Sequence, residues 1–226
     1  MKSKQFRNIT LVVLGLCAMS ATLPAFATTS ASVSVSSIYL WRGTSLSGAG
    51  PEVSGDFNYN HDSGAYAGIW TSSEGASGST ETDLTAGFAK KFGDFGIDVG
   101  IVEYLYPDAV AKPVPPATVG SNKLFDTDIS EFFVGGSFGP ISAKLFVNTE
   151  EAKNMYFTVD GMWGKFGAHF GSTMRKDSAE KYNDFNVSYM PVDNLTWTLS
   201  FASGDGVKNH EDPFFVVSYK WPFDIK

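Results

Sequence analysis

Cysteine is nearly absent from the sequence, since Cys17 is the only one among 226 residues. A disulfide-stapled small domain is therefore excluded. Charge is also scarce, at 18% of residues, and positive charge is the scarcer sign, with 17 Lys and Arg against 24 Asp and Glu. The net charge of −7 argues against a nucleic-acid-binding protein, which would carry a basic surface.

Average hydrophobicity is low for a membrane protein, because the mean hydropathy is only −0.06. This excludes a bundle of spanning helices, but it allows a membrane protein in which only every second residue faces lipid. Aromatic residues reach 15% and hydrophobic residues 43%, with 23 glycines. Such a content of apolar residues argues against disorder, and the composition fits neither collagen nor a coiled coil. The composition is unusual for a soluble enzyme.

The first 27 residues have the pattern of a secretory signal peptide. Three basic residues precede a short apolar stretch from Leu11 to Met19, and Ala25-Phe26-Ala27 forms a cleavage motif. Cys17 follows a leucine, which argues against lipidation. With residues 1–27 removed, residues 28–226 form one domain of 226 − 27 = 199 residues, with a charge of 14 − 24 = −10. The sequence thus predicts an exported protein without cysteine.

The rest of the chain alternates apolar and polar residues with a period of two, which is typical of β-strands. Phe95, Ile97 and Val99, for example, are separated by Gly96 and Asp98. Most of the predicted strands are long enough to cross a bilayer when tilted. Twelve strands are predicted, at residues 32–43, 51–60, 65–73, 80–90, 95–106, 128–138, 141–149, 154–163, 166–174, 182–190, 195–203 and 213–221.

Short turns and longer polar loops alternate between these strands. The short connections carry turn residues, as in His61-Asp62-Ser63-Gly64 and Gly139-Pro140. Loops such as Pro107 to Thr127 would all lie at the other end. This asymmetry predicts an all-β fold, a closed antiparallel transmembrane β-barrel of about 12 strands with short periplasmic turns and longer outer loops. The alternative is a soluble β-sandwich or lipocalin-like barrel, but the large size of the apolar residues favours lipid.

Several blocks of sequence resemble the TorF family of outer-membrane porins. The stretches Ser37–Ser45, Asp56–Tyr59 and Ser63–Trp70 resemble the start of that family, and later blocks are similar at Glu81–Phe88, Asp98–Gly100, Tyr104–Pro107 and Glu131–Pro140. The resemblance implies a bacterial outer-membrane barrel that is a porin by architecture. Such barrels usually end on an aromatic residue. This chain instead runs on to Lys226, so that Trp221 or Phe223 would serve.

Catalytic or metal-binding patterns are weak. A G-x-S-x-G motif spans Gly135 to Gly139, but Pro140 leads into another strand, so a hairpin turn is favoured over a nucleophile elbow. The three histidines, His61, His169 and His210, lack the spacing of a zinc site. The run His210-Glu211-Asp212 could bind a divalent ion weakly, but such a run is usually a solvated charged loop. We therefore expect no enzymatic activity, no metal and no cofactor.

The polar faces of the predicted strands supply the candidate functional residues, which would line the pore. They comprise eight acids, three bases and one histidine, namely Arg42, Glu52, Asp56, Glu81, Asp83, Asp98, Glu131, Lys144, Asp160, His169, Asp184 and Lys220. Either these charges pair across strands and plug the interior, or unpaired acids give a weak preference for cations. A twelve-stranded barrel is compatible with both outcomes.

The resulting functional prediction is a monomeric or weakly oligomeric outer-membrane channel for passive diffusion of small solutes. One alternative is a non-conducting structural or adhesive barrel with a plugged lumen, and another is an outer-membrane hydrolase. The loop Pro107 to Thr127 would form a lid or a surface loop. The expected partners are outer-membrane lipid and lipopolysaccharide, the barrel assembly machinery and small solutes, with no nucleic acid.

Overall fold

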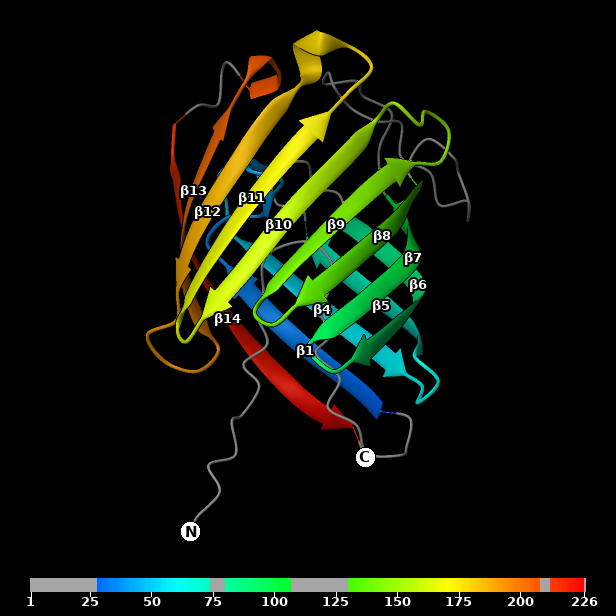
Figure 1. The fold of residues 1–226 in the computed structure, drawn as a ribbon. Helices are drawn as coiled ribbons and strands as arrows, with labels where there is room; N and C mark the ends of the chain where they lie inside the picture. Colours follow the sequence, from blue (N-terminus) through cyan, green and yellow to red (C-terminus); the bar gives the residue numbers. More distant parts are fainter. Residues whose placement is uncertain (1–27, 74–79, 107–129, 208–211, 226) are drawn as a thin grey trace.

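The computed structural model describes residues 28–73, 80–106, 130–207 and 212–225. Within these residues, twelve strands form a closed antiparallel barrel, which confirms the predicted fold class (Figure 1). The predicted signal peptide, the whole loop 107–127 and His210 lie outside the described residues. The barrel strands are β1 (Thr28–Ser36), β4 (Glu52–Asn60), β5 (Ala65–Ser73), β6 (Thr80–Phe92), β7 (Phe95–Leu105), β8 (Ser130–Phe138), β9 (Ile141–Asn148), β10 (Met155–Trp163), β11 (Phe166–Met174), β12 (Tyr182–Tyr189), β13 (Leu195–Ser203) and β14 (Phe214–Ile225).

Each barrel strand pairs with its neighbours in sequence, and β1 closes the ring by pairing with both β4 and β14. Val33 faces Gly55 of β4 on one side and Trp221 of β14 on the other. At the base of the β1–β4 connection, Ser37 donates its backbone N–H to the carbonyl of Val217 at 2.9 Å. The first and last strands are therefore joined along their length, and the sheet has no free edge.

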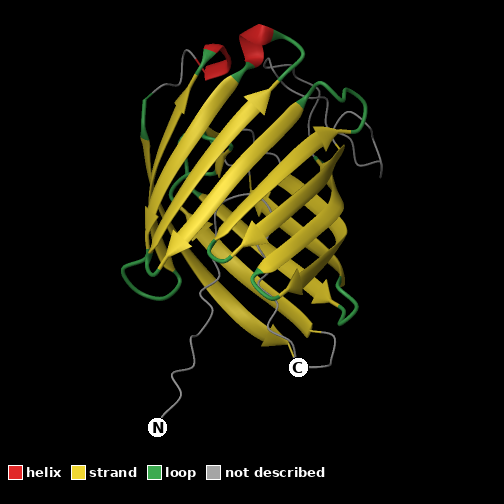
Figure 2. Ribbon diagram, viewed as in Figure 1, coloured by secondary structure: helices red, strands yellow, loops and turns green. Residues whose placement is uncertain are grey.

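The two ends of the barrel differ, as predicted. One end, the turn end, carries the short connections and the two chain ends of the sheet. The other, the loop end, carries the longer connections, including the short 3₁₀ helices η2 (Ser178–Glu180) and η3 (Asp205–Val207) (Figure 2). Within the described residues, no helix is long and apolar enough to cross a membrane.

The turn-end connections are tight because each contains a residue with positive φ. Gly64, Gly93, Gly139 and Gly164 have φ values of 104°, 66°, 55° and 63°, and Asn194 has 69°. Glycine adopts this conformation without steric cost, and asparagine tolerates it better than other residues. The predicted turns are confirmed, and Gly139 lies in a strand-to-strand turn rather than a nucleophile elbow.

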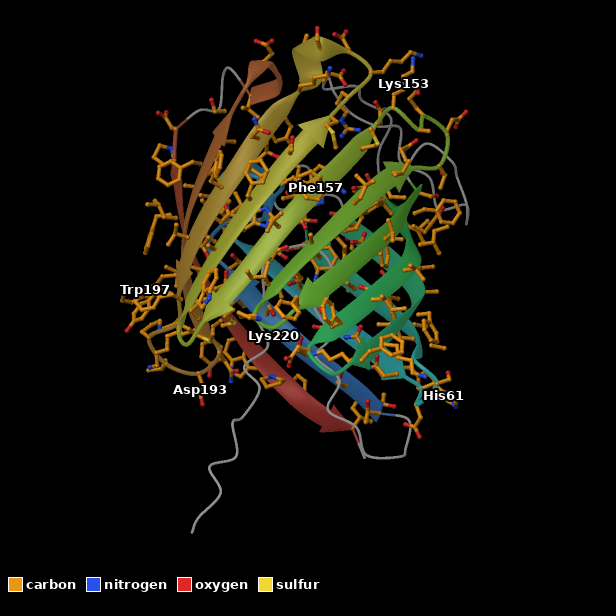
Figure 3. The ribbon with its side chains drawn as sticks, in the orientation of Figure 1. His61, Lys153, Phe157, Asp193, Trp197 and Lys220 are labelled. Carbon is orange, nitrogen blue, oxygen red and sulfur yellow. The ribbon has the colours of Figure 1, made fainter. Side chains whose placement is uncertain are left out.

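The outer surface of the barrel is apolar because side chains on successive strand residues face opposite sides of the sheet. In β4, Phe57 is 45% exposed whereas its neighbour Asn58 is only 7% exposed. Exposed rings gather toward the turn end, where Phe95 and Phe138 have centroids 4.7 Å apart and Phe166 lies 4.9 Å from Tyr189. Figure 3 shows Trp197 in the same region, pointing away from the barrel. An apolar surface with an aromatic girdle is the form that a bilayer requires.

Two of the predicted strands have wrong boundaries. The first strand was expected at 32–43, but β1 spans Thr28–Ser36 and the chain then turns into the barrel. The apolar residues from Ile38 to Trp41, which resemble a lipid-facing row, lie in that inward segment. The last strand, expected to end at 221, continues to Ile225, because Trp221 to Ile225 pair with the start of β1. Phe223 is consequently part of the closing strand.

The membrane-facing outer row can be tested with Phe185→Arg. Phe185 is 47% exposed in the middle of β12, where an arginine would have to enter hydrocarbon. We expect a loss of about 2–4 kcal/mol in the free energy of unfolding, measured on the barrel in lipid vesicles. Val192→Arg is the matched control, because Val192 is 56% exposed but lies in a turn, where the loss should be about 0–1 kcal/mol. Equal losses would contradict a lipid-facing β12.

Candidate functional site

The lumen receives the inward-facing row of every strand together with a hairpin from the β1–β4 connection. Eleven of the twelve predicted pore-lining residues lie on these inward rows, and Arg42 lies in the hairpin. The hairpin consists of β2 (Leu40–Trp41) and β3 (Thr44–Ser45). Leu40 is 1% exposed and Ser47, just after the hairpin, is also 1% exposed. The hairpin is thus enclosed by the barrel.

The turn of this hairpin is tight and unusual. Trp41 pairs with Thr44, which leaves Arg42 and Gly43 as a two-residue connection. Their φ values are 47° and 76°, the pattern of a type I′ turn, in which glycine or asparagine is usual at the first position. An arginine there is a strained choice, and such strain gathers at functional positions.

The hairpin spans the lumen from one wall to the other. It starts between β1 and β4, and in the ring of strands β9 and β10 lie directly opposite. Near its base, the ring of Tyr39 lies 5.6 Å from that of Trp70 on β5. At its tip, Gly43 lies so close to β12 that an added Cβ would overlap the Cβ of Asp184. The hairpin therefore obstructs the barrel at this level.

Arg42 fixes the tip of the hairpin to the far wall. Its guanidinium donates two hydrogen bonds to the Glu131 carboxylate of β8, at 3.1 and 2.5 Å. It also lies 4.3 Å from the ring centroid of Trp41 and 4.2 Å from that of Tyr156 on β10. Tyr104 on β7 donates a further hydrogen bond to Glu131 at 2.8 Å. Arg42 and Glu131 are only 8% and 6% exposed, so this is a buried, bidentate ion pair of the strong type.

A second cluster lies beside the hairpin tip on β10, β11 and β12. His169 lies between two carboxylates, with Nδ1 2.7 Å from Asp160 and Nε2 2.9 Å from Asp184. The hydroxyl of Tyr156 lies 3.1 Å from Nε2 of His169 and donates to Asp184. Asp184 is fully buried. The histidine bridges two of the predicted acids and joins them to the Arg42 site through Tyr156.

Two further ion pairs involve the predicted lysines. Lys144 of β9 lies 2.6 Å from Asp98 of β7, which also accepts a hydrogen bond from Tyr66 at 2.7 Å. Lys220 of β14 lies 3.1 Å from Asp56 of β4, and Figure 3 labels it in the barrel interior. These pairs neutralise charge on opposite sectors of the wall.

The remaining predicted acids are Glu52 and Glu81, whose partners are hydroxyl groups, and Asp83. Glu52 accepts a hydrogen bond from Ser72 at 3.0 Å. Glu81 accepts hydrogen bonds from Tyr39 at 2.5 Å and Tyr106 at 2.7 Å. Asp83 is 9% exposed, and within the described residues its Oδ1 has no hydrogen-bond partner. A buried carboxylate oxygen without a donor is costly, which makes Asp83 the exception in this network.

Sequence reasoning missed the tyrosines that organise these carboxylates. Tyr104 has the same strand parity as Asp98, and Tyr156 has the same parity as Asp160, so both face the lumen. That signal was present in the alternation, but aromatic residues were assigned to the lipid-facing row. Trp41 was missed because its segment was expected to be a barrel strand.

Residues outside the lumen add little chemistry. At the loop end, a hydrogen bond from Lys176 at 2.9 Å lowers the pKa of the exposed Glu151 carboxyl. His61 lies in a turn, where its Nδ1 accepts from the backbone N–H of Ser63 at 3.1 Å. In the described part of the chain, no group of three or more His, Cys, Asp or Glu is arranged to hold a metal ion.

Comparisons with known proteins support the fold. The profile of Gcw_chp, described as a bacterial protein of unknown function, matches residues 20–202. No curated protein matches the chain. Among solved structures, the KdgM porin aligns with a TM-score of 0.50 and 10% identity over 87% of this chain and 99% of its own. A chain from "Unveiling the Mechanism Behind the in-meso Crystallization of Membrane Proteins" aligns with a TM-score of 0.56 and 11% identity over 88% and 84%. At these identities the likeness concerns the fold alone.

The close approach of the hairpin tip to the wall predicts the effect of Gly43→Ala. The new methyl would overlap Asp184, so we expect the hairpin to leave its site and expose Arg42. Trypsin should then cleave the detergent-solubilised barrel after Arg42, as detected by mass spectrometry, whereas the wild type should resist cleavage there.

Gly139→Ala is the matched control for that substitution. Gly139 also has positive φ, 55°, but no atom lies within 4 Å of its added Cβ. Both variants carry the backbone cost of about 1–2 kcal/mol, and only Gly43→Ala adds the overlap. Cleavage after Arg42 in both variants, or in neither, would show that the hairpin is not held by this contact.

Proposed function

Because the chain belongs to the Gcw_chp family of bacterial proteins, whose function is unknown, we propose its function from its own fold. It is an outer-membrane porin-like channel for small solutes, and its β2–β3 hairpin closes the lumen in the described conformation. The apolar outer surface and the separation of short turns from longer loops support this assignment. The resemblance of Ser37–Ser45 to the TorF porins supports it too, and those residues include the hairpin.

The observation that carries the proposal is the contrast between the two faces of the sheet. Apolar side chains cover the outside, and the inward rows of a twelve-stranded barrel are polar and charged. A barrel of this size is wider than the eight-stranded barrels whose side chains fill the interior. The β2–β3 hairpin takes up this space. Its two strands share only two paired positions. A hairpin with so few paired positions can move without breaking the hydrogen bonds between the barrel strands.

A non-conducting barrel is the second candidate, and the hairpin itself favours it. The buried ion pair of Arg42 with Glu131 and the contact of Gly43 with β12 are those of a plug. The lysine pairs further reduce the free charge of the wall. A structural or adhesive barrel would keep this plug permanently in place, whereas a channel would release it.

The charge of the lumen supports a weak preference for cations. Among the twelve predicted pore-lining residues, eight are acidic and three are Lys or Arg, and the net negative charge would attract cations into the lumen. Lipopolysaccharide and the barrel assembly machinery are the partners expected of such a barrel, and an enzymatic role has no support from the site.

Channel function can be tested by removing the plug. We expect the purified wild-type chain to show low or intermittent conductance in planar bilayers. Replacing Tyr39–Ser47 with a Gly-Ser linker should raise the conductance severalfold, because the obstruction is lost. The reversal potential in a salt gradient should indicate cation preference.

Two controls make this experiment decisive. A heat-dependent shift in gel mobility shows that the variant is a folded barrel, and the Gly139→Ala variant should retain wild-type conductance. A folded, plug-free variant that passes no current would contradict the channel proposal and favour the structural barrel. A reversal potential that favours chloride would contradict the cation preference alone.

A further inference from the structure

The wall of the lumen holds the Arg42 guanidinium as a protein holds a bound ligand. Glu131 accepts two parallel hydrogen bonds from the planar fork of the guanidinium, a geometry that a primary amine cannot reproduce. The ring of Tyr156 lies 4.2 Å from the guanidinium carbon, which suits a cation–π contact. Tyr104 orients Glu131 from the other side at 2.8 Å. Glu131, Tyr104 and Tyr156 belong to the barrel wall and are independent of the hairpin.

The same wall has more capacity for positive charge than Arg42 uses. Asp83 on β6 is nine-tenths buried, and its Oδ1 has no hydrogen-bond partner among the described residues. It lies directly opposite Tyr104 in the pairing of β6 with β7, so it belongs to this site. An unsatisfied carboxylate oxygen at this place can accept a donor from a ligand, and such a bond would relieve its desolvation cost.

The hairpin that delivers Arg42 is suited to release. Its two strands share only two paired positions, and the backbone of Arg42 is in a conformation that non-glycine residues rarely adopt, with φ of 47°. Loss of the Arg42–Glu131 ion pair would remove the main polar contact between the hairpin tip and the wall. The hydrogen bonds between the barrel strands would remain intact.

We propose that the site formed by Glu131, Asp83, Tyr104 and Tyr156 binds the guanidinium group of a soluble compound in place of Arg42, and that this exchange frees the hairpin. Arg42 thus competes with a cationic solute for the same binding site. The binding site stands on the geometry of the wall, whereas the opening of the lumen rests on the proposed channel function. Because the carboxylate of Glu131 and the ring of Tyr156 match a planar guanidinium, the cation is organic.

Binding is tested on the purified full-length barrel in detergent, with L-arginine amide as the probe and L-citrulline amide, whose side chain is uncharged, as its counterpart. Isothermal titration calorimetry should show binding of arginine amide and none of citrulline amide. Arg42→Gln removes the competing guanidinium, so it should bind arginine amide about tenfold more tightly than the wild type. Equal affinity of the two probes for Arg42→Gln would overturn the proposal.

Asp83→Asn separates a binding role from a structural one. Because no hydrogen bond to Oδ1 is lost, this variant should fold normally, as judged by heat-dependent gel mobility. In the Arg42→Gln background it should weaken arginine amide binding by about tenfold, the scale of one charge-assisted hydrogen bond. The control is Lys176→Gln in the same background, which removes an exposed cation at the loop end. It should bind arginine amide like Arg42→Gln alone. Unchanged affinity in Asp83→Asn would remove Asp83 from the site.

Conductance tests the second half of the proposal. In planar bilayers, arginine amide should raise the open probability of the wild type, and citrulline amide should not. The Arg42→Gln channel should be open without a probe, and arginine amide should reduce its current by occupying the lumen. Binding without conductance in any variant, including the plug-free one, would overturn the channel function while the site stands. Conductance without discrimination between the probes would overturn the site while the channel stands.

Discussion

Closure of the sheet is the constraint on which the rest of this structure depends. A backbone N–H or C=O group inside hydrocarbon has no water to bind, so a strand protein can span a bilayer only if every strand has two neighbours. Here β1 meets that condition by pairing with β4 along one side and β14 along the other. Once the ring is closed, successive side chains must alternate between lipid and lumen. The neutral mean hydropathy of the sequence is the average of these two rows.

The size of the ring poses a second physical problem, which the chain solves with its own backbone. Side chains can fill an eight-stranded barrel, but twelve strands leave more space. The β2–β3 hairpin occupies that space, and buried carboxylates hold it through Arg42 and Tyr39. Polar groups then need partners, which explains why tyrosine hydroxyls contact four of the lumen acids, Glu81, Asp98, Glu131 and Asp184. The network is specific in shape because a misplaced partner would leave a buried charge unpaired.

Local signals were enough to predict the barrel itself. Period-two alternation located the strands, and Gly64, Gly93 and Asn194 marked turns that need positive φ. The same signals were insufficient for the segment after Ser36, because Ile38 to Trp41 are as apolar as a lipid-facing row and their destination depends on the space inside the ring. Which lumen charges meet was also beyond local pattern. Arg42 reaches Glu131, 89 positions away, only because β8 lies across the lumen from the start of the hairpin.

The position of the hairpin between the first two barrel strands has a consequence for assembly. Strands β1 and β14 lie at opposite ends of the chain, and contacts between distant segments form late in folding because their loop-closure cost is highest. Ser37, at the base of the hairpin, bonds to Val217 of that last strand. The base of the hairpin is therefore fixed only when the seam between β1 and β14 forms. The step that closes the sheet thus also anchors the segment that obstructs the lumen.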